Sequence, residues 1–324
     1  MTSNSQPNSG AQPQAQCFEP ANPVARLLRN FGLATLGLAL GFAKPLWGLM
    51  QFTRHSEFHS YILLIPFISL YLAWLKRGSL RIRFEPVRKM ASVFLAAGIL
   101  VLLAYWLFLR SRLMLVEDDY LAVMMISFLL LFCGICGIFL GKEALRAFSF
   151  PLALLGFMVP IPTFAMPSIN AFLQNGSAAA AQGFFSLSGM PYLKAGLVFQ
   201  LPDINLEVAT ECSGIQSSMV LLITGLVAGH LFLRRPWNRA ILALLMIPLG
   251  LLRNGFRVFT IGELCVRIGP QMIHSPIHYK GGPIFFALSL ILLFLLLVVL
   301  QRSERSSGKP KLKIGGDPNS KPLK

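Results

Sequence analysis

Apolar blocks separated by short polar segments run through most of this chain of 324 residues, of which 55% are hydrophobic. Each block is roughly twenty residues long, which is the length that an α-helix needs to cross the hydrocarbon core of a bilayer. The pattern predicts an all-α polytopic membrane protein with about eight transmembrane helices. The predicted spans are residues 27–50, 59–75, 90–109, 120–140, 144–161, 214–233, 238–260 and 283–301. The second and the fifth are short, and they contain Pro66 and Pro151.

Positive charge alternates along the chain with these spans. If both termini lie in the cytoplasm, the inner segments hold twenty Lys and Arg residues and the outer segments six, whereas the acidic residues divide five inside and eight outside. Cytoplasmic loops retain an excess of positive charge, so the pattern predicts this orientation and an even number of spans. The net charge of +16 is then explained by anionic lipid headgroups beside the spans. We therefore expect the lipid bilayer, and no nucleic acid, as a partner.

The two ends of the chain differ in composition from the apolar middle. Residues 1–26 are rich in Ser, Gln, Asn and Pro, and residues 302–324 are rich in Lys, Pro, Gly and Ser. Such segments bury too little apolar surface to fold, so we predict a disordered cytoplasmic tail at the start and a basic cytoplasmic tail at the end. Residues 27–301 are predicted to form one transmembrane domain.

The longest predicted outer segment, residues 162–213, precedes the sixth span. Its first part, residues 163–190, is rich in Ala, Ser, Gly and Phe and is predicted to form interfacial helices. Apolar residues then alternate from Gly196 to Val208 around a Pro-Asp pair, which predicts a short extracytoplasmic hairpin.

Cys212 follows this hairpin and lies just before the sixth span. Ser213 and Gln216 have the spacing of a capping box, which predicts that the helix begins beside Cys212 and Gly214. Unpaired N–H groups at a helix N-terminus favour a thiolate and can bind the oxyanion of a tetrahedral intermediate. Glu211 opposes the thiolate, so a nearby cation is needed.

The seventh span supplies two cations. Arg253 and Arg257 are four residues apart on one helical face, and Arg257 lies within about a turn of the predicted outer end. A charge at membrane depth is costly, which indicates a function, although a side chain that reaches towards the headgroups is an ordinary alternative. Asn254, three residues before Arg257, is placed to hold its guanidinium.

His278 precedes Gly282 and Pro283 at the start of the eighth span. Proline suits the first turn of a helix, and glycine suits a tight approach of two backbones. A histidine in an outer loop is either simply solvated or functional. Together with Cys212 and Arg257 it would provide a nucleophile, an acid and base, and a stabiliser of the thiolate or oxyanion.

The other cysteines do not indicate a disulfide framework. Cys133 and Cys136 lie in an apolar span, where small residues let helices approach, and packing explains them better than a redox or metal pair. Cys265 falls on the same outer side as Cys212, and a bridge between these two stays open.

The motifs resemble those of the exosortase/archaeosortase family of membrane proteins. The segment Glu211-Cys-Ser-Gly-Ile215 is similar to the family's Cys motif, Asn254-Gly-Phe-Arg257 to its NxxR motif, and His278-xxx-Gly282-xxx-Phe286 to its His motif. The order and spacing of the family are kept. One departure is Glu211, which stands where alanine is common.

Two further features extend the resemblance to roughly residues 30–300. His59 opens the second span, and Pro160-Ile161-Pro162 ends the fifth; both are also similar to family features. His59 either contacts the substrate or anchors its helix.

The resemblance implies a cysteine peptidase or transpeptidase in the bacterial inner membrane, with an extracytoplasmic site and without cofactor or metal. The implied substrates are exported proteins with a C-terminal sorting signal of PEP-CTERM type, which combines a Pro-Glu-Pro-like motif, a membrane helix and a basic tail. The sequence does not identify the acceptor nucleophile. The implied catalytic residues are Cys212, Arg257 and His278, supported by Asn254, Ser213, Gly214, Gly282, Arg253 and His59.

Two other protein classes fit parts of the sequence. In a transporter, Lys44, Arg253 and Arg257 would line a route through the membrane, but no acidic residue lies in a predicted span to complete a coupled cation path. In a membrane metalloprotease, the ligands would be His55, His59, His274 and His278. The segment HSEFH departs from the HExxH pattern, and Pro276 interrupts helical spacing in the second pair.

Overall fold

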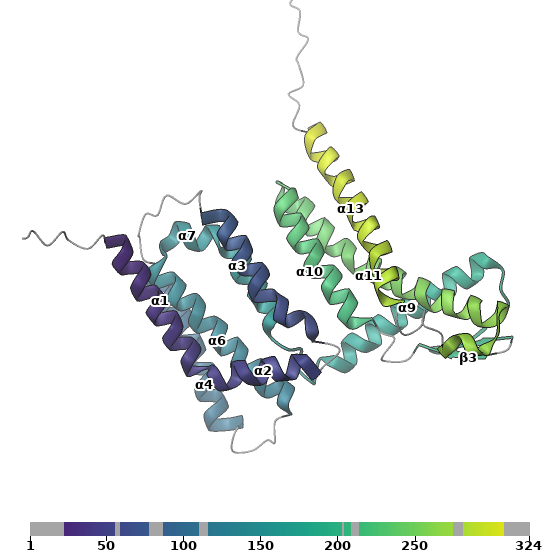
Figure 1. The fold of residues 1–324 in the computed structure, drawn as a ribbon, viewed down its shortest axis with the longest axis horizontal. Helices are drawn as coiled ribbons and strands as arrows, with labels where there is room; N and C mark the ends of the chain where they lie inside the picture. The colour runs from purple at the N-terminus through teal and green to yellow at the C-terminus, as the bar shows by residue number, and fades with distance from the viewer. Residues whose placement is uncertain are drawn as a thin grey trace, which may run out of the picture.

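Helices form most of the computed structural model, which describes residues 23–55, 59–77, 87–109, 116–202, 204–208, 214–274 and 281–307 (Figure 1). Within these ranges, five helices are long and apolar enough to cross a membrane. They are α4 (Arg88–Ala104) with its extension η3 (Tyr105–Leu109), α6 (Glu117–Phe139), α10 (Ile215–Phe232), α11 (Pro236–Arg267) and α13 (Gly282–Ser307). The chain is therefore an all-α, multi-pass membrane protein with one small sheet.

The first predicted span is a bent pair of helices. The helices α1 (Pro23–Gly41) and α2 (Ala43–His55) meet at 67°, so that the pair is either one broken span or a re-entrant loop. Phe42 at the break is buried and packs edge-on against Phe128 of α6, with 5.5 Å between the ring centroids. This aromatic contact turns the chain before the apolar block ends.

Two shorter segments stand where the second and fifth spans are predicted. One consists of η1 (Ser60–Leu64) and α3 (Ile65–Lys76), and the other of α8 (Ser149–Leu154) and η4 (Leu155–Met158), preceded by α7 (Gly141–Ala147). Ser69 Oγ of α3 donates to the carbonyl of Pro151 at 2.8 Å, which joins the two segments. Both are apolar but shorter than a full span, so the total of eight stays a prediction.

Two apolar clusters hold the helices together. One joins α2, η1, α6 and α8 and includes Ile62 and Met125, and the other joins α10, α11 and α13 and includes Leu242 and Leu293. Ile223 of α10 belongs to the first cluster, so α10 connects the N-terminal helices to the C-terminal ones.

The described part of the segment before α10 contains one helix and a sheet. The single helix α9 (Met166–Ser188) stands where several interfacial helices are predicted. After it come β1 (Leu193–Ala195), β2 (Val198–Leu201) and β3 (Ile204–Glu207), which pair antiparallel in the order β1-β2-β3. Phe199, Leu201 and Leu206 of the sheet are buried against α9 and α11.

The helix α11 extends further than the sequence predicts. It ends at Arg267, whereas the seventh span is predicted to end at residue 260. Val258, Ile261 and Cys265 are buried against the sheet and α9, and this packing keeps the chain helical beyond the apolar block. Arg257 therefore lies ten residues before the end of its helix (257 against 267), and its predicted place within about a turn of the outer membrane boundary stays a prediction.

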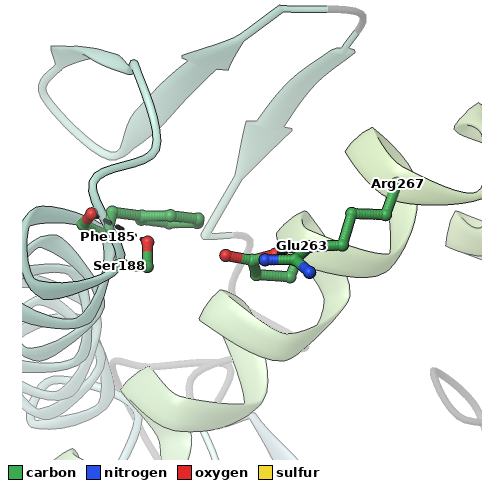
Figure 2. A network of polar contacts seen from close by, with 4 residues as sticks. All are labelled: Phe185, Ser188, Glu263 and Arg267. Atoms are coloured by element: carbon green, nitrogen blue, oxygen red, sulfur yellow. Dashed lines mark hydrogen bonds and ion pairs between the residues drawn. The ribbon is translucent and has the colours of Figure 1, made fainter.

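The ends of α9 and α11 face each other beside the sheet (Figure 2). Phe185 points from α9 towards α11, where Gly262 makes room for it, since an added Cβ there would lie 2.7 Å from the ring. Arg267 forms an ion pair with Glu263 one turn earlier, and Ser188 Oγ donates to the carbonyl of Phe185 at 2.9 Å. Glu263 and Arg267 end the apolar sequence pattern, although the chain stays helical up to Arg267.

Small residues allow α9 and α11 to approach closely. An added Cβ on Gly255 of α11 would lie 2.5 Å from Cβ of Ala180, 2.8 Å from N of Ala181 and 2.9 Å from the carbonyl oxygen of Ser177. Small residues are typical of membrane helix interfaces, because they let two backbones come together. The helix α9 thus packs directly against the middle of α11.

Replacing Gly255 with alanine should force α9 and α11 apart, because the clash involves backbone atoms that cannot rotate away. We expect the free energy of unfolding to fall by about 1–3 kcal/mol in a detergent unfolding experiment. Gly37→Ala in α1 is the matched control, since its added Cβ meets nothing within 4 Å. Equal stability of the two variants would contradict this packing.

Candidate functional site at the N-terminus of α10

The start of α10 is the place where the described candidate residues gather. The helix begins at Ile215, and Gly214 before it adopts the left-handed conformation at φ 68°. Gln216 Nε2 donates to Ser60 Oγ of η1 at 2.6 Å. The predicted capping box is therefore wrong, because Gly214 occupies the N-cap position and the Gln216 side chain binds η1 instead. Ser213 lies outside the described residues.

Arg253 of α11 is held against this end of α10. The residue is 8% exposed, and its Nη2 donates to Ser217 Oγ at 2.6 Å. Ser217 Oγ in turn donates to the carbonyl of Gly214 at 3.0 Å. An added Cβ on Gly214 would lie 3.1 Å from Arg253 Nη2. The guanidinium is therefore in contact with the residue two places after Cys212.

Asn254 contacts the same glycine and links it to α9. An added Cβ on Gly214 would lie 3.1 Å from Asn254 Oδ1. Asn254 Nδ2 donates to Ser177 Oγ of α9 at 3.0 Å, and both residues are buried. The sequence predicts that this amide holds Arg257, whereas the hydrogen bond of its nitrogen goes to α9. Asn254 therefore joins α9 to the start of α10.

These contacts do not use the whole Arg253 guanidinium. Its Nη1 is buried and has no hydrogen-bond partner among the residues that the structure describes. A buried donor without an acceptor is costly, more so on a charged group. Arg257 lies one turn later and is close enough to interact electrostatically with Arg253. The positive charge beside Gly214 suits an anion such as a thiolate or an oxyanion.

His59 lies at the rim of this arrangement. It is 2% exposed and packs against Phe52 of α2 and against Tyr61, with ring centroids 5.1 Å and 6.5 Å apart. The next residue, Ser60, is the one that Gln216 binds. Of its two possible roles, the burial favours an anchor that fixes η1 beside α10.

The start of α13 also reaches α11 near Arg257. Phe285 is buried and packs edge-on against Phe256, with 6.0 Å between the ring centroids. The first turn of α13 closes when Phe285 N donates to the carbonyl of Gly281 at 3.2 Å. An added Cβ on Gly282 meets no atom within 4 Å, so the tight approach predicted at this glycine is wrong.

Two of the three predicted catalytic residues, Cys212 and His278, lie outside the described residues. Their neighbours are described: Gly214 contacts Arg253 and Asn254, and Gly281 belongs to the first turn of α13. The third, Arg257, is on α11, one turn after Arg253 and next to Phe256. The roles of all three stay predictions.

Three serines complete the site and were not identified from the sequence. Ser60, Ser177 and Ser217 accept hydrogen bonds from Gln216, Asn254 and Arg253 respectively. They come from η1, α9 and α10, so only the tertiary structure brings them together. The one sequence signal is the position of Ser177 within a run of small residues, which marks a close helix contact.

No group of three His, Cys, Asp or Glu side chains able to hold a metal is present in the part of the chain that the structure describes. The bridge between Cys212 and Cys265 that the sequence left open is not formed, because Cys265 is a buried free thiol. Cys133 and Cys136 are also free.

Replacing Gly214 with alanine should disturb Arg253 and Asn254 in addition to straining the backbone. Gly189→Ala is the matched control, because Gly189 has nearly the same positive φ, 71° against 68°, but no atom within 4 Å of an added Cβ. The strained backbone should cost roughly 1–2 kcal/mol in both variants. We expect Gly214→Ala to lose about 1–3 kcal/mol more in detergent unfolding, and equal losses would show that the contacts are not tight.

Comparison with known proteins gives a match at the level of the family. No curated protein and no solved structure matches the chain. The family model described as transmembrane exosortase matches residues 52–295, which include η1, α9, α10 and α11 and therefore the whole site described above. The chain thus belongs to the transmembrane exosortase family.

Proposed function

We propose that this protein is a membrane-embedded cysteine peptidase or transpeptidase that cleaves the C-terminal sorting signal of exported proteins at the outer face of the inner membrane. The observation that carries the proposal is the contact of Arg253 and Asn254 with Gly214, since this contact brings a cation to the residues that follow Cys212. Membership of the transmembrane exosortase family supports the same function.

Covalent geometry limits how far Cys212 can lie from this cation. Consecutive Cα atoms are 3.8 Å apart, so the Cα of Cys212 lies at most about 7.6 Å from that of Gly214. Arg253 Nη2 is in van der Waals contact with Gly214. This limit allows the thiol to reach the positive charge that a thiolate beside Glu211 needs.

The same reasoning limits the position of His278. It lies three residues before Gly281, so their Cα atoms are at most about 11.4 Å apart. The first turn of α13 packs on Phe256, the neighbour of Arg257. This limit allows the imidazole to reach the turn of α11 that carries Arg257, which supports its proposed role as acid and base.

In the proposed reaction the Cys212 thiolate attacks the scissile carbonyl, and Arg257 stabilises the thiolate or the oxyanion that forms. The C–S bond forms as the C–N bond breaks, and His278 gives its proton to the leaving amine. An amine or another nucleophile, or water, then attacks the thioester and returns a proton to His278. This second step frees the thiolate.

Arg253 is proposed to position the site, because its guanidinium binds Ser217 and orients the first turn of α10. Asn254 has the same kind of role towards α9. The proposed substrate carries its own membrane helix and would present its Pro-Glu-Pro-like motif just outside the bilayer, level with Cys212. Its basic tail would stay on the cytoplasmic side.

Cys212→Ala should abolish cleavage of a reporter protein that ends in a Pro-Glu-Pro motif, an apolar helix and a basic cluster. The protein level should stay normal, because the substitution removes only the nucleophile. Cys133→Ala is the control, since Cys133 is half-buried in α6, away from the site. Undiminished cleavage by Cys212→Ala in immunoblots of whole cells would reject the proposed function.

The proposed orientation can be tested by labelling. Leu193 of β1 is 71% exposed and Trp237 of α11 is 80% exposed, and the two lie at opposite ends of the proposed topology. In intact spheroplasts, a membrane-impermeant maleimide should label Leu193→Cys above the wild-type background. Trp237→Cys should be labelled only after the membrane is permeabilised. The reverse pattern would place the site in the cytoplasm.

A further inference from the structure

The strand β3 lies at an edge of the sheet, and no further strand among the described residues pairs with its outer side. Val208 N donates to the carbonyl of Leu197 at 3.0 Å, which identifies this opposed pair as a hydrogen-bonded one. Hydrogen-bonded and non-hydrogen-bonded pairs alternate in an antiparallel ladder, so Leu206 and Ile204 also bond to β2. The N–H and C=O groups of Asn205 and Glu207 therefore point away from the sheet.

No described residue hydrogen-bonds to these outward groups. The side chains of Asn205 and Glu207 are exposed, so neither α9 nor α11 covers the face of the sheet on which they lie. Sheet edges are usually protected by short strands, charged side chains, proline, a bulge or a covering element, because unpaired edges bind other strands. The strand β3 is short, and Glu207 is its one charged residue. The four residues of β3 include neither proline nor lysine.

Two separate hydrogen bonds of α9 hold the end of β3 and the candidate site. Gln174 Nε2 of α9 donates to the carbonyl of Val208 at 3.0 Å. Ser177, one helical turn later on α9, accepts the hydrogen bond from Asn254. Residues three apart lie on the same face of a helix. The end of β3 and the Gly214 contact are thus held by neighbouring side chains of α9.

We propose that the outer edge of β3 binds an extended segment of the substrate protein by strand addition, through the backbone groups of Asn205 and Glu207. The inference rests on the proposed function, because the chain continues from this strand to Cys212. Strand addition gives affinity through main-chain hydrogen bonds and places alternate side chains on each face. A segment bound here is directed along β3 towards the nucleophile.

The edge favours a particular kind of segment. In an added strand, every second residue turns its N–H away from β3, and proline is tolerated only at such positions. A Pro-x-Pro segment meets this condition, because both prolines face outwards while the middle residue bonds to β3. An acidic middle residue would pair opposite Asn205 rather than Glu207, since like charges directly opposite each other are unfavourable.

Replacing Asn205 with proline tests the proposal in the full-length protein. The change removes an N–H that no bond of the sheet uses, so the sheet should be kept while the substrate loses a hydrogen bond. We expect the rate constant for cleavage of the reporter protein to fall by about tenfold. Lys194→Pro is the matched control, because Lys194 of β1 faces the other edge in the same way. The Lys194→Pro variant should cleave the reporter protein at nearly the wild-type rate.

Cross-linking provides a second measurement that does not depend on turnover. Asn205→Cys is combined with Cys212→Ala, and single cysteines are placed along the reporter segment before its helix. Disulfides should form at every second position, because alternate side chains of an added strand lie on the same face. A variant without the cysteine at position 205 gives the background.

The outcomes separate this proposal from the proposed function. If Cys212→Ala abolishes cleavage while Asn205→Pro and Lys194→Pro cleave equally well, strand addition is wrong and the cysteine mechanism stands. Strand addition would also be wrong if disulfides formed at consecutive rather than alternate positions of the reporter segment. The same holds if they formed only between two copies of the protein. If Cys212→Ala cleaves normally, the proposed function itself fails.

Discussion

A single turn of α11, residues 253–256, fixes the positions of three other helices. Arg253 binds α10 through Ser217, Asn254 binds α9 through Ser177, Gly255 lets α9 approach, and Phe256 packs on the first turn of α13. Successive residues of an α-helix are rotated by about 100°, so four consecutive side chains point in all directions around the axis. One turn can therefore contact several neighbours at once, and a shift of α11 would move every one of these contacts.

The partners of the polar residues in this turn explain why the site keeps its positive charge. Arg253 bonds to a hydroxyl rather than to a carboxylate, so its charge is not cancelled by that bond. The ordinary way to stabilise a buried arginine is an ion pair, which would also remove its field. Hydroxyl partners hold the guanidinium in place while leaving its charge to act on an anion. The N–H groups at the start of α10 add to this field in the same direction.

The sequence predicts the membrane architecture well where hydropathy is the only determinant. The five long apolar helices are confirmed, because about twenty apolar residues have no stable alternative in a bilayer. The bend at Phe42, the length of α11 and the N-cap of α10 were missed because each depends on tertiary contacts.

For the candidate site, the sequence identified Arg253, Asn254 and Gly214, whose type or spacing is unusual. It could not find Ser177 and Ser217, since a serine acquires a role only from its neighbours.

The length of α11 connects the candidate site to the sheet. At 1.5 Å per residue, its 32 residues span about 48 Å, while the hydrocarbon core is about 30 Å thick. The remaining turns would be unstable in water with Val258 and Ile261 exposed, and the sheet with α9 buries both. The sheet therefore stabilises the C-terminal end of the helix that carries Arg253, and β3 leads from this layer into the segment before α10. Because one packing unit sets both the helix and the strand, a peptide held along β3 and a thiol beside Gly214 would keep a fixed relation to each other.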